Sequence, residues 1–355
     1  MQIYGLMPVN GAACSSMPCD KSPQMAFQSP IELSDIKTAA QRIAPCIRTT
    51  PLVTSESLSR LSKTPVYLKL EHHQITNSFK LRGASNAVMA LPEAAKQRGV
   101  VGVSTGNHGR GLAHAAQENG VRCIICMSQL VPQNKIDGIK ALGAEVRIIG
   151  QSQDDAQIEV DHLVAEQGMT MIPPFDHPDI VTGQASLGLE LFEALPGLQT
   201  VLVPVSGGGL ISGVASALKA LKKDVKIIAV SMERGAAMHA CLQAGKPILV
   251  KEEATLADSL GGGIGLDNQI TFNITQNLVD EFILVSEIEI AQAIRHAYWQ
   301  ERQIIEGSGA VCLAALLSQK VKPEGNTIAC VTGGNIDLSV HHRIISGENV
   351  DISNL

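Results

Sequence analysis

Apolar runs and amphipathic stretches alternate along the chain in a regular rhythm, most clearly between residues 100 and 172. The apolar runs have the length of buried strands, and the stretches between them carry apolar residues at helical spacing. Glycine follows two of these stretches directly, at Gly143 and Gly168, as is common at a helix C-terminus. The expected strands are 100–103, 121–127, 145–149 and 169–172, and the expected helices are 109–119, 135–142 and 154–167. Strands that alternate with helices predict a parallel sheet with ligands at the carboxyl ends of its strands.

The same alternation continues on both sides of this region. Ser34 can cap a first helix, which Pro45 stops. Further strands are expected at 66–70, 200–205, 225–230 and 327–331, and further helices up to residue 195, up to residue 221, at 288–304 and at 308–317. The rhythm breaks around residues 173–178, which marks a crossing between two lobes. We therefore expect an irregular arm at 1–28, a small, mobile inserted domain at 99–176, and a large domain formed by 29–98 and 177–355.

Composition and charge exclude several classes of function. The 355 residues suffice for two lobes, and 32 glycines with few aromatic residues suit packed helices and tight turns. A net charge of −6 without a basic stripe argues against a nucleic-acid partner. No apolar run approaches the roughly 20 residues that span a bilayer, and residues 1–28 lack the basic start and apolar core of a secretion signal. We therefore expect a cytoplasmic protein that binds neither nucleic acid nor a membrane.

The cysteines show no sign of a disulfide framework or a metal site. All eight are scattered along the chain, which suits the reducing cytoplasm. Cys123 and Cys126 form a C-x-x-C pair within an expected strand, where positions three apart point to opposite faces. A redox or zinc role for this pair is therefore not expected.

Lys80 has the position that most suggests chemistry. The strand expected at 66–70 leads through a polar turn to Asn77 or Ser78, either of which can cap the next helix. Lys80 then falls in the first helical turn, next to Phe79. The positive end of the helix dipole and the apolar neighbours disfavour its ammonium form and leave a better nucleophile. The alternative is an ordinary lysine with a solvated tip, so the other motifs have to decide.

The glycine-rich turn at 206–210, Ser-Gly-Gly-Gly-Leu, follows a strand and opens a helix. Its backbone N–H groups can point at one anion, and the helix dipole favours a phosphate there. One alternative is a merely tight turn. Another is a dinucleotide fingerprint formed by Gly207, Gly209, Gly213 and Glu233, although the spacing departs from G-x-G-x-x-G. We prefer the phosphate site.

Four other polar or glycine-rich turns lie at the ends of expected elements. Residues 104–109, Ser-Thr-Gly-Asn-His-Gly, can hold a carboxylate, or a ring hydroxyl through Asn107, or can simply cap a helix. Residues 332–337, Thr-Gly-Gly-Asn-Ile-Asp, offer a neutral hydroxyl, whereas the turns 306–310 and 258–263 can be plain connections. A lysine, a phosphate site, an anion loop and a neutral hydroxyl are together what pyridoxal-phosphate chemistry requires.

From about residue 31 to the end, the chain resembles the fold-type-II pyridoxal-phosphate enzymes, specifically the threonine/serine dehydratase and serine racemase family. The motifs S-F-K-x-R-G-A, S-x-G-N-H-G, S-G-G-G-L and T-G-G-N-I-D occur in the family order. The resemblance implies an α/β, tryptophan synthase β-like fold with two open, twisted, mostly parallel sheets flanked by helices. It also implies a large domain that binds pyridoxal 5′-phosphate, and a homodimer.

The resemblance gives individual residues a place in the site. Lys80 resembles the Schiff-base lysine, and Phe79 the residue beside the cofactor ring. Asn107 looks like the partner of the 3-hydroxyl, and Thr332 stands where the family has a serine that binds the pyridine nitrogen. The remaining residues placed at the cofactor are Gly207, Gly208, Gly209 and Leu210 of the phosphate loop, and Glu306. The substrate-carboxylate loop contains Ser104, Thr105, Gly106 and His108.

Three departures from the family pattern bear on these roles. Ser206 replaces the first glycine of the common four-glycine loop, and Thr105 stands where racemases place a serine base. Glu233 and the carbonyl of Ala237 match two members of a divalent-cation site, but His239 replaces an expected aspartate. The loss of that hard oxygen ligand argues against magnesium or calcium there.

The resemblance implies β-elimination of water and then loss of ammonia from a 3-hydroxy α-amino acid, with Lys80 removing the α-proton. The chain ends soon after Asp337, without room for the regulatory domain of biosynthetic threonine deaminases, so a short, catabolic-type enzyme is expected. The alternatives are serine racemisation, β-replacement as in cysteine synthase and, outside the enzymes, a dinucleotide-sensing module.

Three segments suggest a finer assignment. Residues 150–156, 231–237 and 261–267 look like the hydroxyectoine-utilisation dehydratase branch, whose substrate is hydroxy-diaminobutyrate. The extra ammonium of that substrate calls for a carboxylate, which Asp258 or Asp176 could supply.

Overall fold

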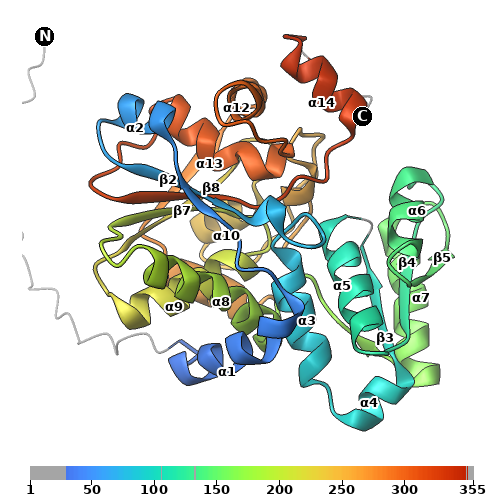
Figure 1. Ribbon diagram of the computed structural model, residues 1–355. Coiled ribbons are helices and arrows are strands. Elements are labelled where there is room, and N and C mark those ends of the chain that lie inside the picture. The colour runs from blue at the N-terminus through green and yellow to red at the C-terminus, as the bar shows by residue number, and fades with distance from the viewer. Residues whose placement is uncertain (1–28, 105, 132, 349, 351–355) are drawn as a thin grey trace, which may run out of the picture.

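The computed structural model describes residues 29–104, 106–131, 133–348 and 350. They contain a six-stranded and a four-stranded sheet, each with helices packed on it (Figure 1). The expected α/β architecture with two mostly parallel sheets is confirmed. The predicted arm at 1–28 lies outside the described residues.

The six-stranded sheet has the order β1-β2-β10-β7-β8-β9. Its strands are β1 (Leu52–Thr54), β2 (Val66–Leu70), β7 (Thr200–Pro204), β8 (Lys226–Met232), β9 (Glu281–Val285) and β10 (Thr327–Val331). β1 and β2 pair in antiparallel, whereas the other neighbours pair in parallel. The parallel strands therefore end at one edge, where the loops after β7 and β10 lie close together.

Helices cover both faces of this sheet. Leu202 and Ile228 face one apolar cluster, and Val201 and Ile227 face another. The first cluster includes residues of α2 (Glu56–Ser62), α12 (Glu287–Trp299) and α13 (Gly307–Leu317), and the second includes residues of α8 (Pro178–Ala194), α9 (Gly209–Leu221), α10 (Ala237–Ala244) and α11 (Ile270–Leu278). Because both faces are buried, the inner strands are continuous apolar runs.

The four-stranded sheet has the order β5-β4-β3-β6 and is parallel throughout. Its strands are β3 (Val100–Val103), β4 (Cys123–Met127), β5 (Glu145–Ile148) and β6 (Thr170–Met171), preceded by α4 (Glu93–Arg98) and alternating with α5 (Asn107–Glu118), α6 (Gln133–Lys140) and α7 (Gln153–Gln167). All these strands lie within the range 99–176. The division into two domains and the mobility of the smaller one stay predictions.

The C-x-x-C pair points to opposite faces of β4, as predicted. Cys123 packs in the cluster that contains Leu112 of α5, and Cys126 packs in the cluster that contains Val160 of α7. Burial raises the pKa of Cys123 to about 12 and, with the Glu159 charge, that of Cys126 to about 11. Both thiols therefore stay protonated and separate, which suits core residues rather than a redox or metal pair.

Helix α3 (Lys80–Ala90) lies between the two sheets, against α5 on one side and α8 on the other (Figure 1). A Cβ atom on Gly83 would lie 2.5 Å from Nε2 of Gln184, and one on Gly183 would lie 2.7 Å from the backbone oxygen of Arg82. The backbones of α3 and α8 therefore meet directly, which requires glycine on both helices.

The predicted start of α3 is wrong in its cap. Phe79, not Asn77 or Ser78, is the N-cap residue, and it provides no side-chain cap. Asn77 has a left-handed φ of 57°, and Ser78 forms a bridge with Gly333. Pairing with the loop after β10 therefore determines the turn, and Lys80 begins the helix.

The other differences concern boundaries and polar edges. Glu32, rather than Ser34, is the N-cap residue of α1 (Leu33–Ile43), and the helix expected at 109 begins at Asn107. The elements that the pattern missed are β1, β9, α2, α4, α10, α11 and α14 (Leu338–Ile345). β1 and β9 form the edges of the six-stranded sheet and are partly exposed, so they lack a continuous apolar run. Within the described residues, no helix is both long and apolar enough to cross a membrane.

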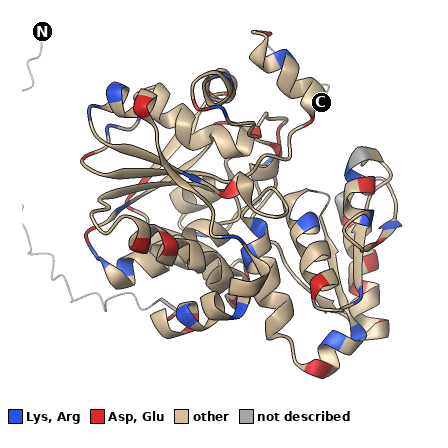
Figure 2. Cartoon of the chain, in the orientation of Figure 1, with Lys and Arg blue, Asp and Glu red and all other residues tan. Residues whose placement is uncertain are grey.

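Positive and negative side chains are interspersed over the helices and loops (Figure 2), but four charged side chains are gathered between β2, α3 and α8. Arg82 donates to both carboxylate oxygens of Glu71 at 2.8 Å, and to Glu190 at 2.7 and 3.0 Å. Lys69 donates to Glu190 at 2.6 Å. The Arg82 and Glu71 side chains have 0% exposure. Two positive and two negative groups make the cluster neutral, so each buried charge has a partner.

This charge cluster holds the turn that carries Lys80. Burial acts to raise the pKa of the Glu71 carboxyl. Arg82, Thr50 and Lys69 act to lower it and outweigh burial, so this pKa lies below its usual value. Glu71 therefore remains ionised and keeps Arg82 in place. Arg82 lies two residues after Lys80, in the same helical turn.

Replacing Arg82 with methionine should destabilise the protein by about 3–5 kcal/mol, because Glu71 would be left buried without its ion-pair partner, while Glu190 would keep only Lys69. The comparable exposed pair of Arg122 and Glu145, with side chains 49% and 43% exposed, provides the control, and Arg122→Met should cost less than about 1 kcal/mol. Urea unfolding of the three proteins measures the difference. Equal losses in the two variants would contradict the structural role of the cluster.

Candidate active site

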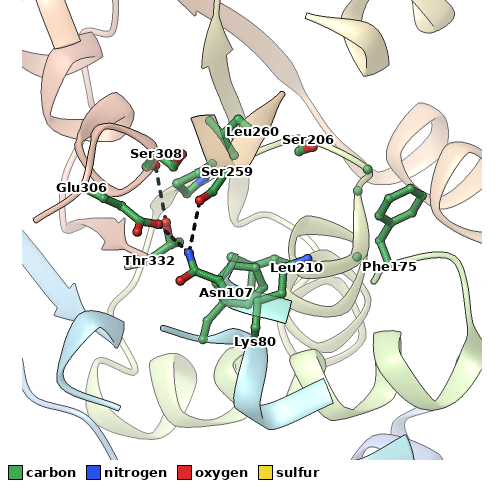
Figure 3. A pocket seen from close by; sticks show the side chains of 15 residues that line it. Lys80, Asn107, Phe175, Ser206, Leu210, Ser259, Leu260, Glu306, Ser308 and Thr332 are labelled. Atoms are coloured by element: carbon green, nitrogen blue, oxygen red, sulfur yellow. Dashed lines mark hydrogen bonds between the residues drawn. The ribbon is translucent and has the colours of Figure 1, made fainter. Parts of the chain in front are cut away.

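A pocket lies where the carboxyl ends of β7 and β10 meet the N-termini of α3, α5 and α9 (Figure 3). Its lining residues are Phe79, Lys80, Asn107, Phe175, Pro204, Ser206, Gly207, Gly208, Gly209, Leu210, Ser259, Leu260, Glu306, Ser308 and Thr332. Every residue that the sequence placed at the cofactor is in this set. The motifs come from distant parts of the chain, and parallel strand ends bring them together, as expected.

Lys80 projects into the pocket from the first turn of α3. Its Nζ donates a hydrogen bond to the carbonyl of Pro174 at 2.9 Å and lies 5.4 Å from the centre of the Phe79 ring. Burial lowers the pKa of the Lys80 ammonium to about 8. A substantial fraction of this amine is therefore neutral near physiological pH, as a nucleophile or a base requires.

The glycine loop forms the start of α9. The backbone N–H groups of residues 206–210 have no acceptor among the described residues. Gly208 has a left-handed φ of 87°, and a Cβ atom on Gly207 would lie 2.3 Å from the Phe175 ring. The loop therefore needs glycine, and it presents unpaired N–H groups at a positive helix end. This arrangement suits a phosphate.

Two hydroxyl groups lie on the β10 side of the pocket. Thr332 is 3% exposed, and among the described residues its hydroxyl has one hydrogen bond, a long one of 3.4 Å from Oγ1 to the carbonyl of Ser308. Ser308 Oγ is buried and has no partner in the described part of the chain. Both hydroxyl groups can therefore hydrogen-bond to a heteroatom of a bound ring, and neither group carries a charge.

Asn107, at the start of α5, is bound to Glu306, at the start of α13. Its Nδ2 donates to Glu306 Oε1 at 2.7 Å, and a longer contact of 3.4 Å reaches Ser259 Oγ (Figure 3). Burial, and then the charge of Asp258, raise the pKa of Glu306 to about 7, although the hydrogen bond from Asn107 acts in the opposite direction. The Asn107 amide is thus held in a defined orientation at the pocket wall.

Among the described residues of the turn at 104–109, one lines the pocket. Of its residues, Asn107 lines the pocket, whereas Ser104, Gly106 and His108 are not among the lining residues. His108 Nε2 is 2.9 Å from the carbonyl of Ile172, and burial, then Lys80, lower the pKa of His108 to about 3. This imidazole is therefore neutral. Thr105 lies outside the described residues, and substrate binding by the loop stays a prediction.

The two candidate carboxylates for a second ammonium differ in availability. Asp176 accepts from the backbone N–H groups of Gln269, Ile270 and Thr271 and so caps α11. Asp258 lies in a short 3₁₀ turn, Asp258–Leu260, next to the pocket residue Ser259. Its side chain is 60% exposed and pairs with Lys135 at 3.4 Å. Asp258 is thus the better placed of the two, at the rim rather than in the lining.

Sequence reasoning did not single out Phe175, Ser308 or Asn335 as site residues. Phe175 covers the glycine loop, Ser308 contributes an unpaired hydroxyl, and Asn335 hydrogen-bonds Asn107. Ser308 and Asn335 stood within the turns at 306–310 and 332–337, so those turns were the available signal. Phe175 lies within the break in the rhythm at 173–178 and carried no signal of its own.

The residues matched to a divalent-cation site do not fit such an ion. Glu233 Oε1 is 3.3 Å from the ammonium of Lys320, which also donates to Glu289 at 2.8 Å and to the carbonyl of Leu284 at 3.0 Å. A lysine ammonium therefore already lies beside Glu233, and the centre of the His239 ring is 5.1 Å from that of Phe282, with the two rings tilted by 50°.

We expect the thermal unfolding midpoint of the protein to be unchanged by EDTA or by millimolar Mg²⁺ or Ca²⁺, because Lys320 serves as the counter-ion of Glu233. Lys320→Met should lower the midpoint slightly, since Glu233 and Glu289 lose their cation, while the exposed control Lys322→Met should not. A midpoint of the unmodified protein that falls in EDTA would contradict this interpretation.

The pocket fits pyridoxal phosphate. It offers unpaired N–H groups for a phosphate, a partly neutral amine for an aldehyde, an oriented amide, and uncharged hydroxyls for a ring nitrogen. Which residue holds which atom of the cofactor stays a prediction for Lys80, Phe79, Asn107, the glycine loop, Glu306 and Thr332.

Comparisons with known proteins agree with this fit. A family model described as "Pyridoxal-phosphate dependent enzyme" matches residues 43–333. A putative threonine dehydratase from Sinorhizobium fredii (strain NBRC 101917 / NGR234) is 55% identical over 320 residues, which are 90% of this chain and 96% of that protein.

Solved structures give the same answer. Maize serine racemase has a TM-score of 0.84 at 32% identity, covering 89% of this chain and 97% of that one. The processed form of threonine deaminase isoform 2 from Solanum lycopersicum has a TM-score of 0.82 at 33% identity, covering 92% and 97%. The expected fold-type-II architecture and the cofactor are confirmed, and the chain belongs to the family of pyridoxal-phosphate-dependent enzymes.

Proposed function

We propose that this enzyme is a dehydratase of the threonine ammonia-lyase type, which removes water and then ammonia from a 3-hydroxy α-amino acid. The observation that carries the proposal is one pocket that joins the Lys80 amine, a phosphate loop and the neutral hydroxyl of Thr332. The 55% identity to a putative threonine dehydratase supports it.

Lys80 is suited to two tasks in this reaction. Pyridoxal phosphate, when bound, withdraws electrons from the α-carbon of an amino acid and so favours loss of the α-proton and of a β-substituent. Nζ of Lys80, with a pKa lowered to about 8, can accept that proton once the substrate amine has taken its place. The carbonyl of Pro174, 2.9 Å away, can hold the protonated amine in the pocket.

Thr332 favours elimination over other outcomes. Its hydroxyl is neutral, and the carboxyl among the lining residues, Glu306, accepts hydrogen bonds from Asn107 and from the backbone of Asn335. A neutral partner does not enforce a protonated ring nitrogen, so a carbanion is stabilised less and a β-hydroxyl leaves more readily.

The enzymatic alternatives remain serine racemisation and β-replacement. The similarity to maize serine racemase speaks for the first, although a racemase needs a second base on the far face of the substrate and Thr105 stands in that place. The dinucleotide-sensing alternative would need Glu233 to exchange its ion pair with Lys320 for the ligand.

The finer proposal concerns hydroxy-diaminobutyrate as substrate. It rests on the segments 150–156, 231–237 and 261–267, and on Asp258 at the pocket rim. To bind the second ammonium, the Asp258 carboxylate would exchange Lys135 for the substrate. A cytoplasmic location and a homodimer also stay predictions.

Lys80→Ala should retain the fold and lose roughly 10²–10⁴-fold or more in turnover of threonine or serine, since the general base and the point of attachment are removed together. The exposed lysine Lys140, replaced in the same way, provides the control and should leave turnover unchanged. Release of 2-oxo acid and ammonia measures the rate. Turnover by Lys80→Ala at the unmodified rate would refute the assignment.

A substrate panel separates the finer proposals. Hydroxy-diaminobutyrate should be turned over faster than threonine and serine, and Asp258→Asn should slow only the diamino substrate, because its second ammonium loses a charged partner. If threonine is preferred and Asp258→Asn has no effect, the hydroxyectoine-related substrate is wrong. Formation of cysteine from O-acetylserine and sulfide, without 2-oxo acid from any hydroxyamino acid, would instead establish β-replacement.

A further inference from the structure

Asn335, in the loop after β10, has no role in the assignments above, yet it touches three parts of the site. Its Nδ2 donates to Oδ1 of Asn107 at 2.6 Å and to the carbonyl of Thr76 at 3.0 Å. Its backbone N–H donates to Oε2 of Glu306 at 3.0 Å. Asn335 therefore links α5, the start of α13 and the turn before α3.

The carbonyl of Thr76 fixes the orientation of both amides. Amide oxygen and nitrogen have to be assigned from their hydrogen-bond partners. A backbone carbonyl can only accept, so the atom of Asn335 that faces Thr76 must be the nitrogen. The same nitrogen faces Asn107, which must therefore present its oxygen to Asn335. It follows that the Asn107 nitrogen points away from Asn335.

The Asn107 nitrogen then has two N–H groups to place. One donates to Glu306 Oε1 at 2.7 Å. The other is directed at Ser259 Oγ over 3.4 Å, a long contact that a stronger acceptor in the pocket can replace. Asn107 and Ser259 both line the pocket, so this second N–H is the one available to a bound molecule (Figure 3).

We propose that Asn335 is a positioning residue, which holds the Asn107 amide so that its NH₂ group, rather than its oxygen, faces the pocket and donates to the 3-oxygen of bound pyridoxal phosphate. With Asn335 removed, the Asn107 oxygen loses its donor, and Glu306 alone opposes a turn of the amide that would direct this oxygen at the anionic oxygen of the cofactor. The inference rests on the cofactor of the family and not on which hydroxyamino acid is the substrate.

The charged groups near this amide chain are Glu306, Asp258, Lys135 and Lys80. None of them is altered by a change at Asn335. Asn335 contacts Glu306 through its backbone N–H, which any residue other than proline retains. A neutral substitution at Asn335 therefore changes the Asn107 amide without changing the set of charges.

The test is a titration of the visible absorption of the cofactor-loaded protein, without substrate. Asn335→Leu and Asn335→Ala should raise the apparent pKa of the absorption change by about one unit, because a donor to the anionic oxygen is lost. Asn107→Ala should produce a similar rise. In the Asn107→Ala background, Asn335→Leu should add no further shift, which defines the coupling between the two residues. Asn77→Gly, which removes the 3.5 Å contact to the other side of Asn335, is the matched control and should leave the pKa unchanged.

Three results would overturn the proposal. The first is an unchanged apparent pKa in both Asn335 variants. The second is a shift of equal size with and without Asn107, and the third is loss of the cofactor in both Asn335 variants while Asn107→Ala retains it. In the last two cases Asn335 would act by another route. Because no substrate is present, none of these results bears on whether the enzyme is a dehydratase.

Discussion

The ion pairs of Arg82 with Glu71 and Glu190 are the interaction on which the geometry of the site depends. They join a strand end, the first turn of α3 and the middle of α8, and the Arg82 and Glu71 side chains are fully buried. An arginine that is held by two carboxylates at once has little freedom to shift or rotate. Lys80 lies two positions earlier in the same helical turn, so its backbone is held in place as well. The Lys80 amine is therefore placed by a neutral salt-bridge cluster whose residues do not line the pocket.

Much of the fold could be predicted from the sequence because the strands of both sheets are buried on two faces. Strands such as β2, β3 and β10 appear as short apolar runs with definite ends, and their boundaries were predicted correctly. The edge strands of the six-stranded sheet, β1 and β9, and several short helices were not predicted, because tertiary contacts rather than their own pattern hold them. The cap of α3 failed for a related reason, since Ser78 is committed to the loop after β10.

The residues of the site also fall into two groups, those recognisable from neighbouring sequence and those recognisable only from contacts between distant segments. The glycine loop and Lys80 could be recognised because the neighbouring residues in the sequence are enough to suggest the chemistry of each. The charge cluster and the amide chain could not, because each unites residues more than a hundred positions apart, such as Arg82 with Glu190 and Asn107 with Asn335. Asparagine and arginine are common residues, and no local spacing distinguishes a positioning residue from a surface one. Such groups become visible only when the distances between segments are known.

The direct contact between α3 and α8 has a consequence for how Lys80 responds to change elsewhere. A Cβ atom on Gly183 would lie 2.7 Å from the backbone oxygen of Arg82 and from Cα of Gly83, so main chain meets main chain at this point. Repacking of nearby apolar side chains, by mutation or by thermal motion, therefore has little effect on the separation of the two helices here. The position of Lys80 relative to the large sheet thus depends on a contact between backbones, which leaves less room for adjustment than a contact between side chains.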